Sequence, residues 1–258
     1  MLVRLGRTRT GRDVSLDPFS SRMMSLTGAT RTGKSMMLYV LLSQLVGHPI
    51  KVCGVDPSGI VFNAIGEQLG GSDWRVMTLR DVVEVQRVMA ELVAEMDDRI
   101  TQLLKLKLDK FDETDFSDAF PLLVVVMEEY PGTLASLAAI DQANGSKPAD
   151  RIEPKVRAAV QRLALEGAKV GVRLWVVAQR ADASLLTGVL RSQLTQRISF
   201  RQDADGLRML HEGITPEEIQ TAQSFKPGQG FVELIGEMPL TMFRADFLPY
   251  EEFVERFR

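Results

Sequence analysis

The stretch that decides the fold is Gly28-Ala29-Thr30-Arg31-Thr32-Gly33-Lys34-Ser35, which fits the pattern G-x-x-x-x-G-K-[ST] of phosphate-binding loops. A loop of this kind points successive backbone N–H groups at phosphate oxygens, and its glycines let the backbone approach them closely. The lysine reaches the β and γ phosphates, and the serine hydroxyl binds Mg²⁺. The stretch from Gly28 to Met36 is therefore predicted to bind a nucleoside triphosphate, ATP, together with Mg²⁺.

The sequence on either side of this loop supports the prediction. The apolar run Met23–Thr27 precedes it and predicts a strand, and the apolar run Met36–Leu42 follows it and predicts a buried helix. Strand, loop and helix in this order are the context that a phosphate-binding loop requires. The alternative is a glycine-rich turn that happens to carry Lys-Ser.

Composition is that of a globular chain. Its 258 residues are 45% hydrophobic and 25% charged, which suits one large α/β domain. The longest apolar stretches, Met36 to Val46 and Leu122 to Met127, fall short of the roughly 18 residues that a membrane span needs. The N-terminus has no apolar core of a signal peptide, so we expect a cytoplasmic protein without an intrinsic membrane segment. A net charge of −3 argues against a generally basic surface but leaves a local basic loop open.

The single cysteine and the two histidines give no sign of a metal site or a disulfide. Cys53 lies within Lys51–Val55, an apolar segment, and is expected to be a small buried side chain. His48 and His211 are distant from it and from each other in sequence, so no metal-ligand cluster can be recognised.

Strands and helices are expected to alternate along the chain. This pattern predicts an α/β fold with a mainly parallel sheet flanked by helices and a β hairpin at each end. Residues 1–21 would form the N-terminal hairpin and lead-in, and residues 22–258 the domain that carries the phosphate-binding loop. The expected strands are 23–27, 50–55, 74–79, 122–127, 172–178 and 196–201 with a hairpin at 230–243, and the expected helices are 34–46, 82–108, 134–140 and 153–169.

Two carboxylates follow the most apolar of these segments. The run Pro121–Met127 predicts a fully buried parallel strand, and Glu128 and Glu129 come directly after it, at the carboxyl end. Hydrolysis of a γ phosphate needs one acidic group that holds the metal and another that polarises the attacking water. We assign Glu128 to Mg²⁺, through a bound water, and Glu129 to the attacking water. The alternative is that both side chains are merely exposed at a strand end.

Further candidates for transition-state stabilisation lie downstream. Gln179 ends the next apolar strand and could sense the γ phosphate. The adjacent Arg180 is a candidate for the same site, with a surface charge as the alternative. An arginine from a neighbouring subunit often neutralises the developing charge. The candidates for this role are Arg162, Arg197 and Arg201, and no sequence rule chooses among them.

With these motifs assembled, the chain resembles the motor core of the FtsK/SpoIIIE family of DNA translocases, in the HerA/FtsK superfamily, which includes the conjugative TraB proteins of actinobacterial plasmids. The resemblance extends from about Leu5 to Leu248. The matching pieces, in family order, are Gly28–Ser35, Val124–Glu129, Arg162–Gly171, Val176–Arg180, Leu186–Leu190, Thr195–Arg201 and Lys226–Gly230.

The resemblance implies that residues 22–258 form a RecA-like P-loop ATPase motor domain, which acts as a homo-hexameric ring and moves double-stranded DNA through its pore. By position it makes Lys34 and Ser35 the phosphate and Mg²⁺ ligands, Glu129 the catalytic glutamate and Gln179 the sensor. It also places Arg162 where the family has its trans-acting arginine finger. Loops after the Glu-Glu strand line the pore in this family, so the DNA-contact candidates are Lys147, Arg151 and Lys155, with a solvated charged loop as the alternative.

Three positions depart from the family pattern. Glu128 stands in place of an aspartate, Arg31 in place of a glycine and Ala181 in place of a proline. From the sequence given, we expect neither a membrane anchor nor a winged-helix module after Leu248. We therefore expect a mobile-element or plasmid-transfer motor with an accessory DNA-recognition or membrane-anchoring protein, or else a fragment of a longer protein.

Two other functions remain open. One is an ATPase of protein secretion or assembly, like the EccC relatives that share this core. The other is a binding module in which nucleotide only regulates assembly.

Overall fold

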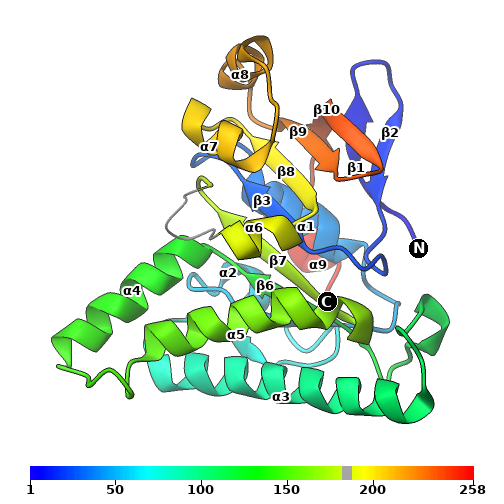
Figure 1. The fold of residues 1–258 in the computed structure, drawn as a ribbon. Coiled ribbons are helices and arrows are strands. Elements are labelled where there is room, and N and C mark those ends of the chain that lie inside the picture. Colours follow the sequence, from blue (N-terminus) through cyan, green and yellow to red (C-terminus); the bar gives the residue numbers. More distant parts are fainter. Residues whose placement is uncertain (182–187) are drawn as a thin grey trace. The chain divides into compact units, whose positions relative to one another are not determined.

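A computed structural model describes residues 1–181 and 188–258 of the chain (Figure 1). The chain forms two compact units. Unit 1 comprises Met1–Gly47 and Val177–Arg258, and unit 2 comprises His48–Val176. Each unit is built on strands covered by helices and is described separately.

Unit 1 combines a parallel strand pair with a series of antiparallel strands. Its strand order is β2-β1-β10-β9-β8-β3. β3 pairs with β8 in parallel, and the remaining neighbours are antiparallel. The strands are β1 (Val3–Thr8), β2 (Asp13–Leu16), β3 (Met24–Thr27), β8 (Gln196–Phe200), β9 (Gln229–Leu234) and β10 (Met238–Ala245).

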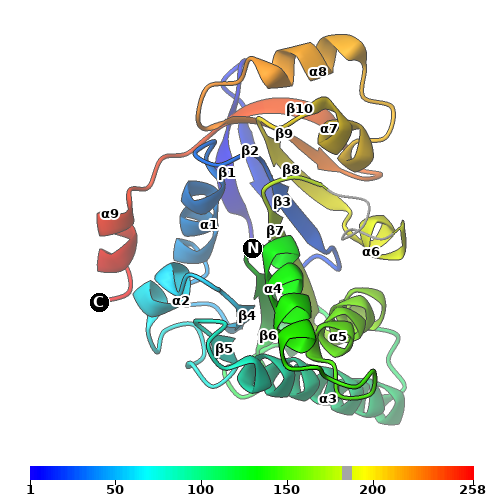
Figure 2. The same cartoon turned by 90° about the vertical axis from the view of Figure 1, so that its left-hand side faces the viewer.

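The helices of unit 1 include the one that follows the glycine-rich loop. This helix, α1, packs beside the C-terminal helix α9 (Figure 2), where the rings of Tyr39 and Phe253 stack with centroids 4.4 Å apart. The described helices are α1 (Lys34–Ser43), α6 (Gly188–Gln193), α7 (Ala204–Leu210), α8 (Pro216–Gln223) and α9 (Tyr250–Glu255).

Unit 2 contains an entirely parallel sheet in the order β7-β6-β4-β5. Its strands are β4 (Ile50–Val55), β5 (Arg75–Val76), β6 (Leu122–Met127) and β7 (Val172–Ala178), whose last two residues belong to unit 1. Figures 1 and 2 show α3 beside α5. The helices are α2 (Ile60–Ile65), α3 (Val82–Leu106), α4 (Tyr130–Ala143) and α5 (Ile152–Glu166), with short 3₁₀ turns η1 (Glu113–Asp115) and η2 (Gly167–Val170).

The buried strands have the composition expected of a parallel sheet with both faces covered. Every residue of β6 and β7 is buried, and both strands are rich in valine and leucine. The long helix α3 instead buries one stripe, which includes Val85, Leu92 and Met96. Asp81 caps this helix by accepting hydrogen bonds from the backbone N–H groups of Val83 and Glu84.

The predicted fold class is confirmed, including the hairpins near both ends, whereas several element boundaries were wrong. The helix predicted at 134–140 begins at Tyr130, because Pro131 is acceptable in a first helical turn, where its missing N–H is not needed. The strand predicted at 74–79 covers only Arg75–Val76, at the edge of the unit 2 sheet. The helix predicted to reach Lys169 ends at Glu166 and continues as η2. Residues Leu186 and Thr187 of the family-like segment lie outside the described residues.

A buried polar cluster joins three elements of unit 1. His211 Nε2 lies 2.7 Å from Ser199 Oγ, and His211 Nδ1 lies 2.9 Å from Glu233 Oε2. A carboxylate only accepts hydrogen bonds, so Nδ1 is the donor to Glu233, and in the neutral imidazole Nε2 is left to accept from the serine hydroxyl. The bond pattern resembles that of a hydrolase triad. However, Ser199 is fully buried and His211 is 1% exposed, so the cluster satisfies polar groups in the core rather than meeting a substrate.

Replacing His211 with alanine should therefore lower the free energy of unfolding by about 2–3 kcal/mol, because Ser199 and Glu233 would lose their buried partner. Urea denaturation measures this change. His48 is exposed, and His48→Ala is the matched control, expected within about 0.5 kcal/mol of wild type. Equal stabilities of the two variants would contradict the structural role of the cluster.

Candidate nucleotide site

The glycine-rich loop is attached to the ends of two strands that are distant in sequence. The backbone N–H of Gly28 donates to the carbonyl of Ala178, at 3.3 Å, and that of Ala29 donates to the carbonyl of Arg201, at 2.8 Å. Gly28 has φ 150°, and a Cβ atom there would lie 2.7 Å from Phe200 Cβ. Only glycine therefore fits where the loop leaves β3.

Lys34 is the first residue of α1, and its side chain turns back into the loop. Its Nζ donates to the carbonyl of Gly28 at 2.6 Å and to that of Ala29 at 3.3 Å, and the residue is only 8% exposed. The Thr32 hydroxyl also donates to the Ala29 carbonyl, at 2.7 Å. The loop is thus closed around an ammonium group, which supplies positive charge where a phosphate would be bound.

The start of α1 adds further donors at the same place. The first helical hydrogen bond runs from Met37 N–H to the Gly33 carbonyl, at 2.9 Å. The preceding N–H groups, those of Ser35 and Met36 among them, belong to the first helical turn and point out of the helix end. Together with the helix dipole they favour an anion, and the exposed Ser35 hydroxyl lies in the same turn.

A turn from the C-terminal part of the chain supports the back of the loop. Gly228 N–H donates to the Thr32 carbonyl at 2.8 Å, and a Cβ atom on Gly33 would lie 3.2 Å from Gly228 N. Ala245 N–H in turn donates to the Gly228 carbonyl at 2.8 Å. The phosphate loop is therefore linked to β10 through this turn.

A cavity of about 500 Å³ adjoins the loop on this side. It has the volume of a small-molecule site, and its walls are mainly apolar. If the phosphates of a nucleotide bind in the loop, its nucleoside portion would occupy this cavity. The side chains that line the cavity include those of Arg31, Met36, Pro227, Arg244 and Phe247.

Phe247 is 77% exposed and lines this cavity, so its ring is accessible to a bound nucleoside. Phe247→Ala should weaken the binding of ATPγS about tenfold, because a ring contact with a base contributes about 1–3 kcal/mol. Calorimetric titration measures the affinity. Leu2, 75% exposed in the same unit, provides the control Leu2→Ala, for which no change is expected. Unchanged affinity in Phe247→Ala would place the nucleoside elsewhere.

Arg31 adopts a backbone conformation that favours glycine. Its φ is 62°, in the left-handed region, and its side chain is exposed and lines the cavity. Such a conformation costs a non-glycine residue about 1–2 kcal/mol. The departure from glycine therefore adds a cation beside the nucleotide site at a small cost in backbone strain.

Gln179 lies where the loop begins. It is exposed and follows Ala178, whose carbonyl accepts the Gly28 hydrogen bond. The neighbouring backbone is fixed by Gln202, which accepts from Ala181 N–H at 3.4 Å and donates to Thr27 Oγ1 at 3.0 Å. Sequence reasoning missed Gln202, because its role depends on the pairing of strands distant in sequence.

Two of the three arginine-finger candidates, Arg197 and Arg201, lie in unit 1, and they differ in burial. Arg197 is buried and donates to the carbonyls of Leu194, at 3.0 Å, and Leu210, at 2.5 Å. Its guanidinium is therefore part of the unit 1 core. Arg201 is exposed next to the loop, and its own carbonyl accepts from Ala29.

In unit 2, the two glutamates follow β6 as predicted. Glu128 N–H donates to the Val55 carbonyl at 2.9 Å, so Glu128 lies beside the end of β4. Glu129 has φ 45° and begins α4, and its carbonyl accepts from Thr133 N–H at 2.8 Å. A left-handed glutamate costs about 1–3 kcal/mol, a kind of strain that concentrates at functional positions.

Asp56, at the end of the neighbouring strand β4, was not singled out by the sequence. It is fully buried, and its carboxylate accepts from Ser58 and from the backbone N–H groups of Gly59, Val61 and Phe62. These bonds occupy the carboxylate in shaping the start of α2, so it is unsuited to bind a metal. Among the described residues, no group of three or more potential ligand side chains is arranged to hold a metal by itself.

The remaining candidates also lie in unit 2. Arg162, on α5, pairs with Asp97 at 2.7 Å and Glu166 at 2.8 Å, and these carboxylates raise the pKa of its guanidinium. Lys147 and Arg151 are exposed between α4 and α5, and Lys155 is exposed in the first turns of α5. The roles of these residues, like those of the two glutamates, stay predictions.

Parallel strands with covering helices, and a glycine-rich loop that closes on a lysine at a helix start, define the fold of P-loop nucleoside triphosphatases. No protein family profile matches the chain. The chain is 24% identical over 233 residues to the DNA translocase FtsK of Sporosarcina ureae, covering 85% of this chain and 28% of the relative. It is 26% identical over 206 residues to the FtsK of Helicobacter pylori strain J99, covering 74% and 22%.

Solved structures agree on the fold. The TcpA coupling protein of pCW3 conjugation, a monomer form with ATPγS, matches with a TM-score of 0.70 at 20% identity, covering 98% of this chain and 70% of that one. The cytoplasmic domain of the Thermomonospora curvata type VII secretion ATPase EccC matches with a TM-score of 0.74 at 21% identity, covering 99% and 31%. The RecA-like P-loop fold and the resemblance to FtsK-type motors are thus confirmed.

The chain spans about a quarter of the length of the curated relatives that it matches. In residues 1–181 and 188–258, none of the helices combines the length and hydrophobicity of a membrane span.

Proposed function

We propose that this chain is the ATP-hydrolysing motor of a DNA translocase of the FtsK type. The observation that carries the proposal is the closed phosphate loop, with Lys34 Nζ 2.6 Å from the Gly28 carbonyl and the first turn of α1 beside it. The similarity to proteins named DNA translocase supports DNA as the substrate that is moved. A solved coupling protein of the same fold with ATPγS supports ATP as the nucleotide.

In this proposal each residue of the site has a separate task. Lys34 and the N–H groups of the loop bind the phosphates and neutralise charge that builds up in the transition state. Ser35 is one proposed ligand of Mg²⁺ and Glu128, through a bound water, is the other; the ion would supply positive charge that stabilises the phosphates. Glu129 orients and polarises the attacking water, and Gln179 senses the γ phosphate.

Assembly is part of the proposed mechanism. A homo-hexameric ring would enclose double-stranded DNA in the cytoplasm, with Lys147, Arg151 and Lys155 as contacts in the pore. An accessory protein would recognise the DNA or anchor the ring in a membrane. Transfer of a plasmid or another mobile element suits such a motor, and the similarity to a conjugation coupling protein supports this use.

ATP hydrolysis stimulated by duplex DNA should fall at least a hundredfold in Lys34→Ala and in Glu129→Gln, because both remove transition-state stabilisation. Lys34→Ala should also lose ATPγS affinity, whereas Glu129→Gln should keep it. The exposed Lys105 and Glu251 provide the controls Lys105→Ala and Glu251→Gln. Wild-type hydrolysis that ignores added duplex would contradict the DNA motor.

The arginine finger predicts complementation between two inactive variants. In a mixed ring, an Arg162→Ala subunit keeps its own Lys34, and a neighbouring Lys34→Ala subunit supplies Arg162. Mixing the two should therefore restore part of the activity that each lacks, and wild-type turnover per subunit should rise with protein concentration. Turnover independent of concentration would reject an active site shared between subunits. Glu166→Gln, which frees Arg162 from one partner, should stay active.

The second candidate is an ATPase of protein secretion or assembly, favoured by the structural similarity to EccC. The two functions differ in whether the chain binds duplex DNA. A DNA motor should bind duplex with an affinity that falls steeply as salt rises, because binding to phosphates releases counterions. Filter binding at about 50 and 200 mM salt separates the two functions. Tight ATP binding with negligible turnover would instead indicate a nucleotide-regulated binding module.

A further inference from the structure

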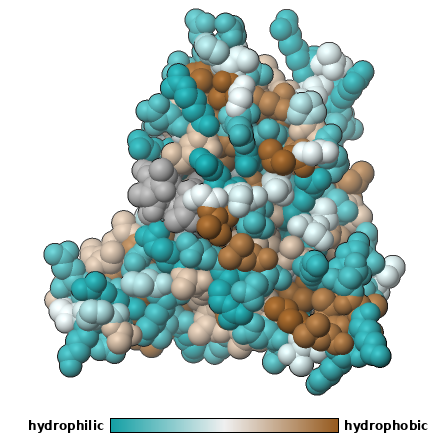
Figure 3. Space-filling model, viewed as in Figure 1, coloured by the Kyte–Doolittle hydropathy of each residue, from teal (hydrophilic) through white to brown (hydrophobic). Residues whose placement is uncertain are grey.

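The N-terminal hairpin gathers positive charge on a chain whose net charge is −3. The ten residues from Arg4 to Asp13 contain four arginines and one aspartate. The hairpin lies at the upper right in Figure 1, and the same region of Figure 3 is covered mainly by hydrophilic side chains. The basic residues are therefore concentrated at one place in unit 1.

Strand pairing brings a fifth arginine to the hairpin. In the sheet register Arg7 lies opposite Asp13 on one side and opposite Arg244 on the other, and Arg244 lies opposite Gln229. Residues directly opposite each other share a face of the sheet, and like charges in this position are destabilising. The neighbouring row contains the buried Phe243, so the arginine row lies on the exposed face.

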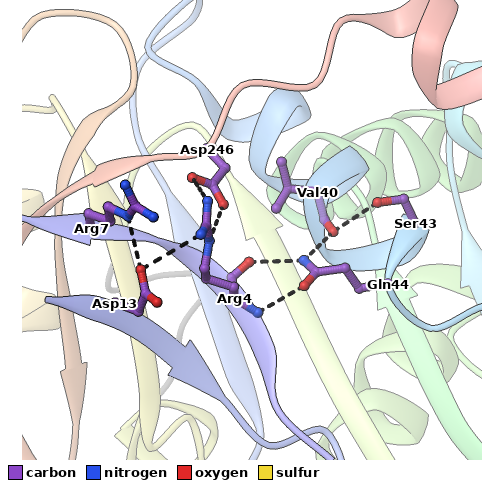
Figure 4. Close-up of polar contacts among 7 residues, drawn as sticks. All are labelled: Arg4, Arg7, Asp13, Val40, Ser43, Gln44 and Asp246. Atoms are coloured by element: carbon purple, nitrogen blue, oxygen red, sulfur yellow. Dashed lines mark hydrogen bonds and ion pairs between the residues drawn. The ribbon is translucent and has the colours of Figure 1, made fainter. Parts of the chain in front are cut away.

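The carboxylates of Asp13 and Asp246 form ion pairs with two of these five arginines. Asp246 accepts from Arg4 at 2.7 and 2.9 Å, and Asp13 pairs with Arg7 at 3.0 Å and Arg4 at 3.7 Å (Figure 4). In the part of the chain that the structure describes, Arg9, Arg12 and Arg244 form no ion pair. An anionic partner would relieve the repulsion between Arg7 and Arg244 as well as neutralise these three.

The surface also has a groove in which neutral hydrogen-bond donors lie beside the arginines. A groove of about 530 Å³ is lined by Arg7, Thr8, Arg9, Gln229 and Arg244, among others. Hydroxyl and amide groups beside arginines are the usual donors to the phosphates of nucleic acids. The hairpin turn is itself ordered by bonds of Thr8 with Arg12, which involve the backbone of Arg12 and leave its guanidinium exposed.

The hairpin is fixed to the helix that follows the phosphate loop. Gln44, directly after α1, accepts from Arg4 N–H and donates to the Arg4 carbonyl, both at 2.9 Å, and it also donates to the Val40 carbonyl (Figure 4). The same Arg4 binds Asp246 at the end of β10. These hydrogen bonds connect the hairpin to α1, so a force applied to the hairpin would be transmitted to the helix that begins at Lys34.

We propose that the exposed face formed by Arg7, Arg9, Arg12 and Arg244 binds the phosphate backbone of duplex DNA, as a second DNA contact on unit 1. The inference rests on the proposed DNA motor and adds a contact distinct from the Lys147–Lys155 segment. Phosphate contacts position a protein on DNA without reading its sequence. The contact would hold the duplex on each subunit, with the link through Arg4 and Gln44 joining it to the nucleotide site.

The test is fluorescence anisotropy with a labelled duplex in the presence of ATPγS, over about 50 to 200 mM salt. Arg9→Gln/Arg12→Gln removes two phosphate contacts. It should weaken binding about tenfold at the lower salt and reduce the slope of log K against log salt by about 2. Hydrolysis without DNA should be unchanged, since neither residue lines the nucleotide cavity. Arg9→Lys/Arg12→Lys, which keeps the charge, should retain most of the affinity.

The matched control is Arg208→Gln/Arg258→Gln, which removes the same charge from exposed positions of unit 1 outside this face and should bind DNA as wild type does. If Arg9→Gln/Arg12→Gln matches wild type while Lys147→Gln/Arg151→Gln/Lys155→Gln binds weakly, the inference is overturned and the DNA motor stands. If the wild type shows no salt-dependent duplex binding, both are overturned. If the variant loses binding only to phosphatidylserine vesicles, the face belongs to a lipid surface and the inference is again overturned.

Discussion

The closure of the phosphate loop depends on hydrogen bonds from its first two residues to strands that are remote in sequence. Gly28 and Ala29 donate to the carbonyls of Ala178 and Arg201. The ammonium group of Lys34 then donates to the carbonyls of Gly28 and Ala29 inside the loop. A phosphate-binding backbone must be organised before the ligand arrives, because ordering it on binding would cost conformational entropy. The pairing of the strands thus prepares the site, and the loop residues supply the charge.

Positive charge is concentrated at particular places on this chain, although its net charge is negative. The molecule is slightly acidic, yet cations line the nucleotide cavity, at Arg31 and Arg244, and the hairpin beside it. Arg244 lines both the nucleotide cavity and the hairpin groove. Two of the four described non-glycine residues with left-handed backbone, Arg31 and Glu129, belong to segments predicted to act on the nucleotide, where strain is tolerated for function.

The sequence predicted those parts of the fold whose signals are local. The loop motif, the valine-rich β6 and β7 and the two hairpins could be recognised because each carries its pattern within a few residues. Helix α8 also has a local signal, since Thr215 and Glu218 form a capping box with Pro216 at the helix start, but it was overlooked. The pairing of Arg7 with Arg244 could not be predicted, because it depends on the register of strands at opposite ends of the chain. The bonds of Gln44 and Gln202 have the same origin.

The most direct test of the central claim is to follow the backbone amides of residues 28–36 by NMR while Mg·ATPγS is added to the wild-type protein. If these amides form the phosphate site, the signals of Thr30 to Met36 and of Gln179 should shift together with one affinity. Those of the exposed helix end around Lys105 should stay in place. Unchanged signals from the loop at a saturating nucleotide concentration would contradict the account.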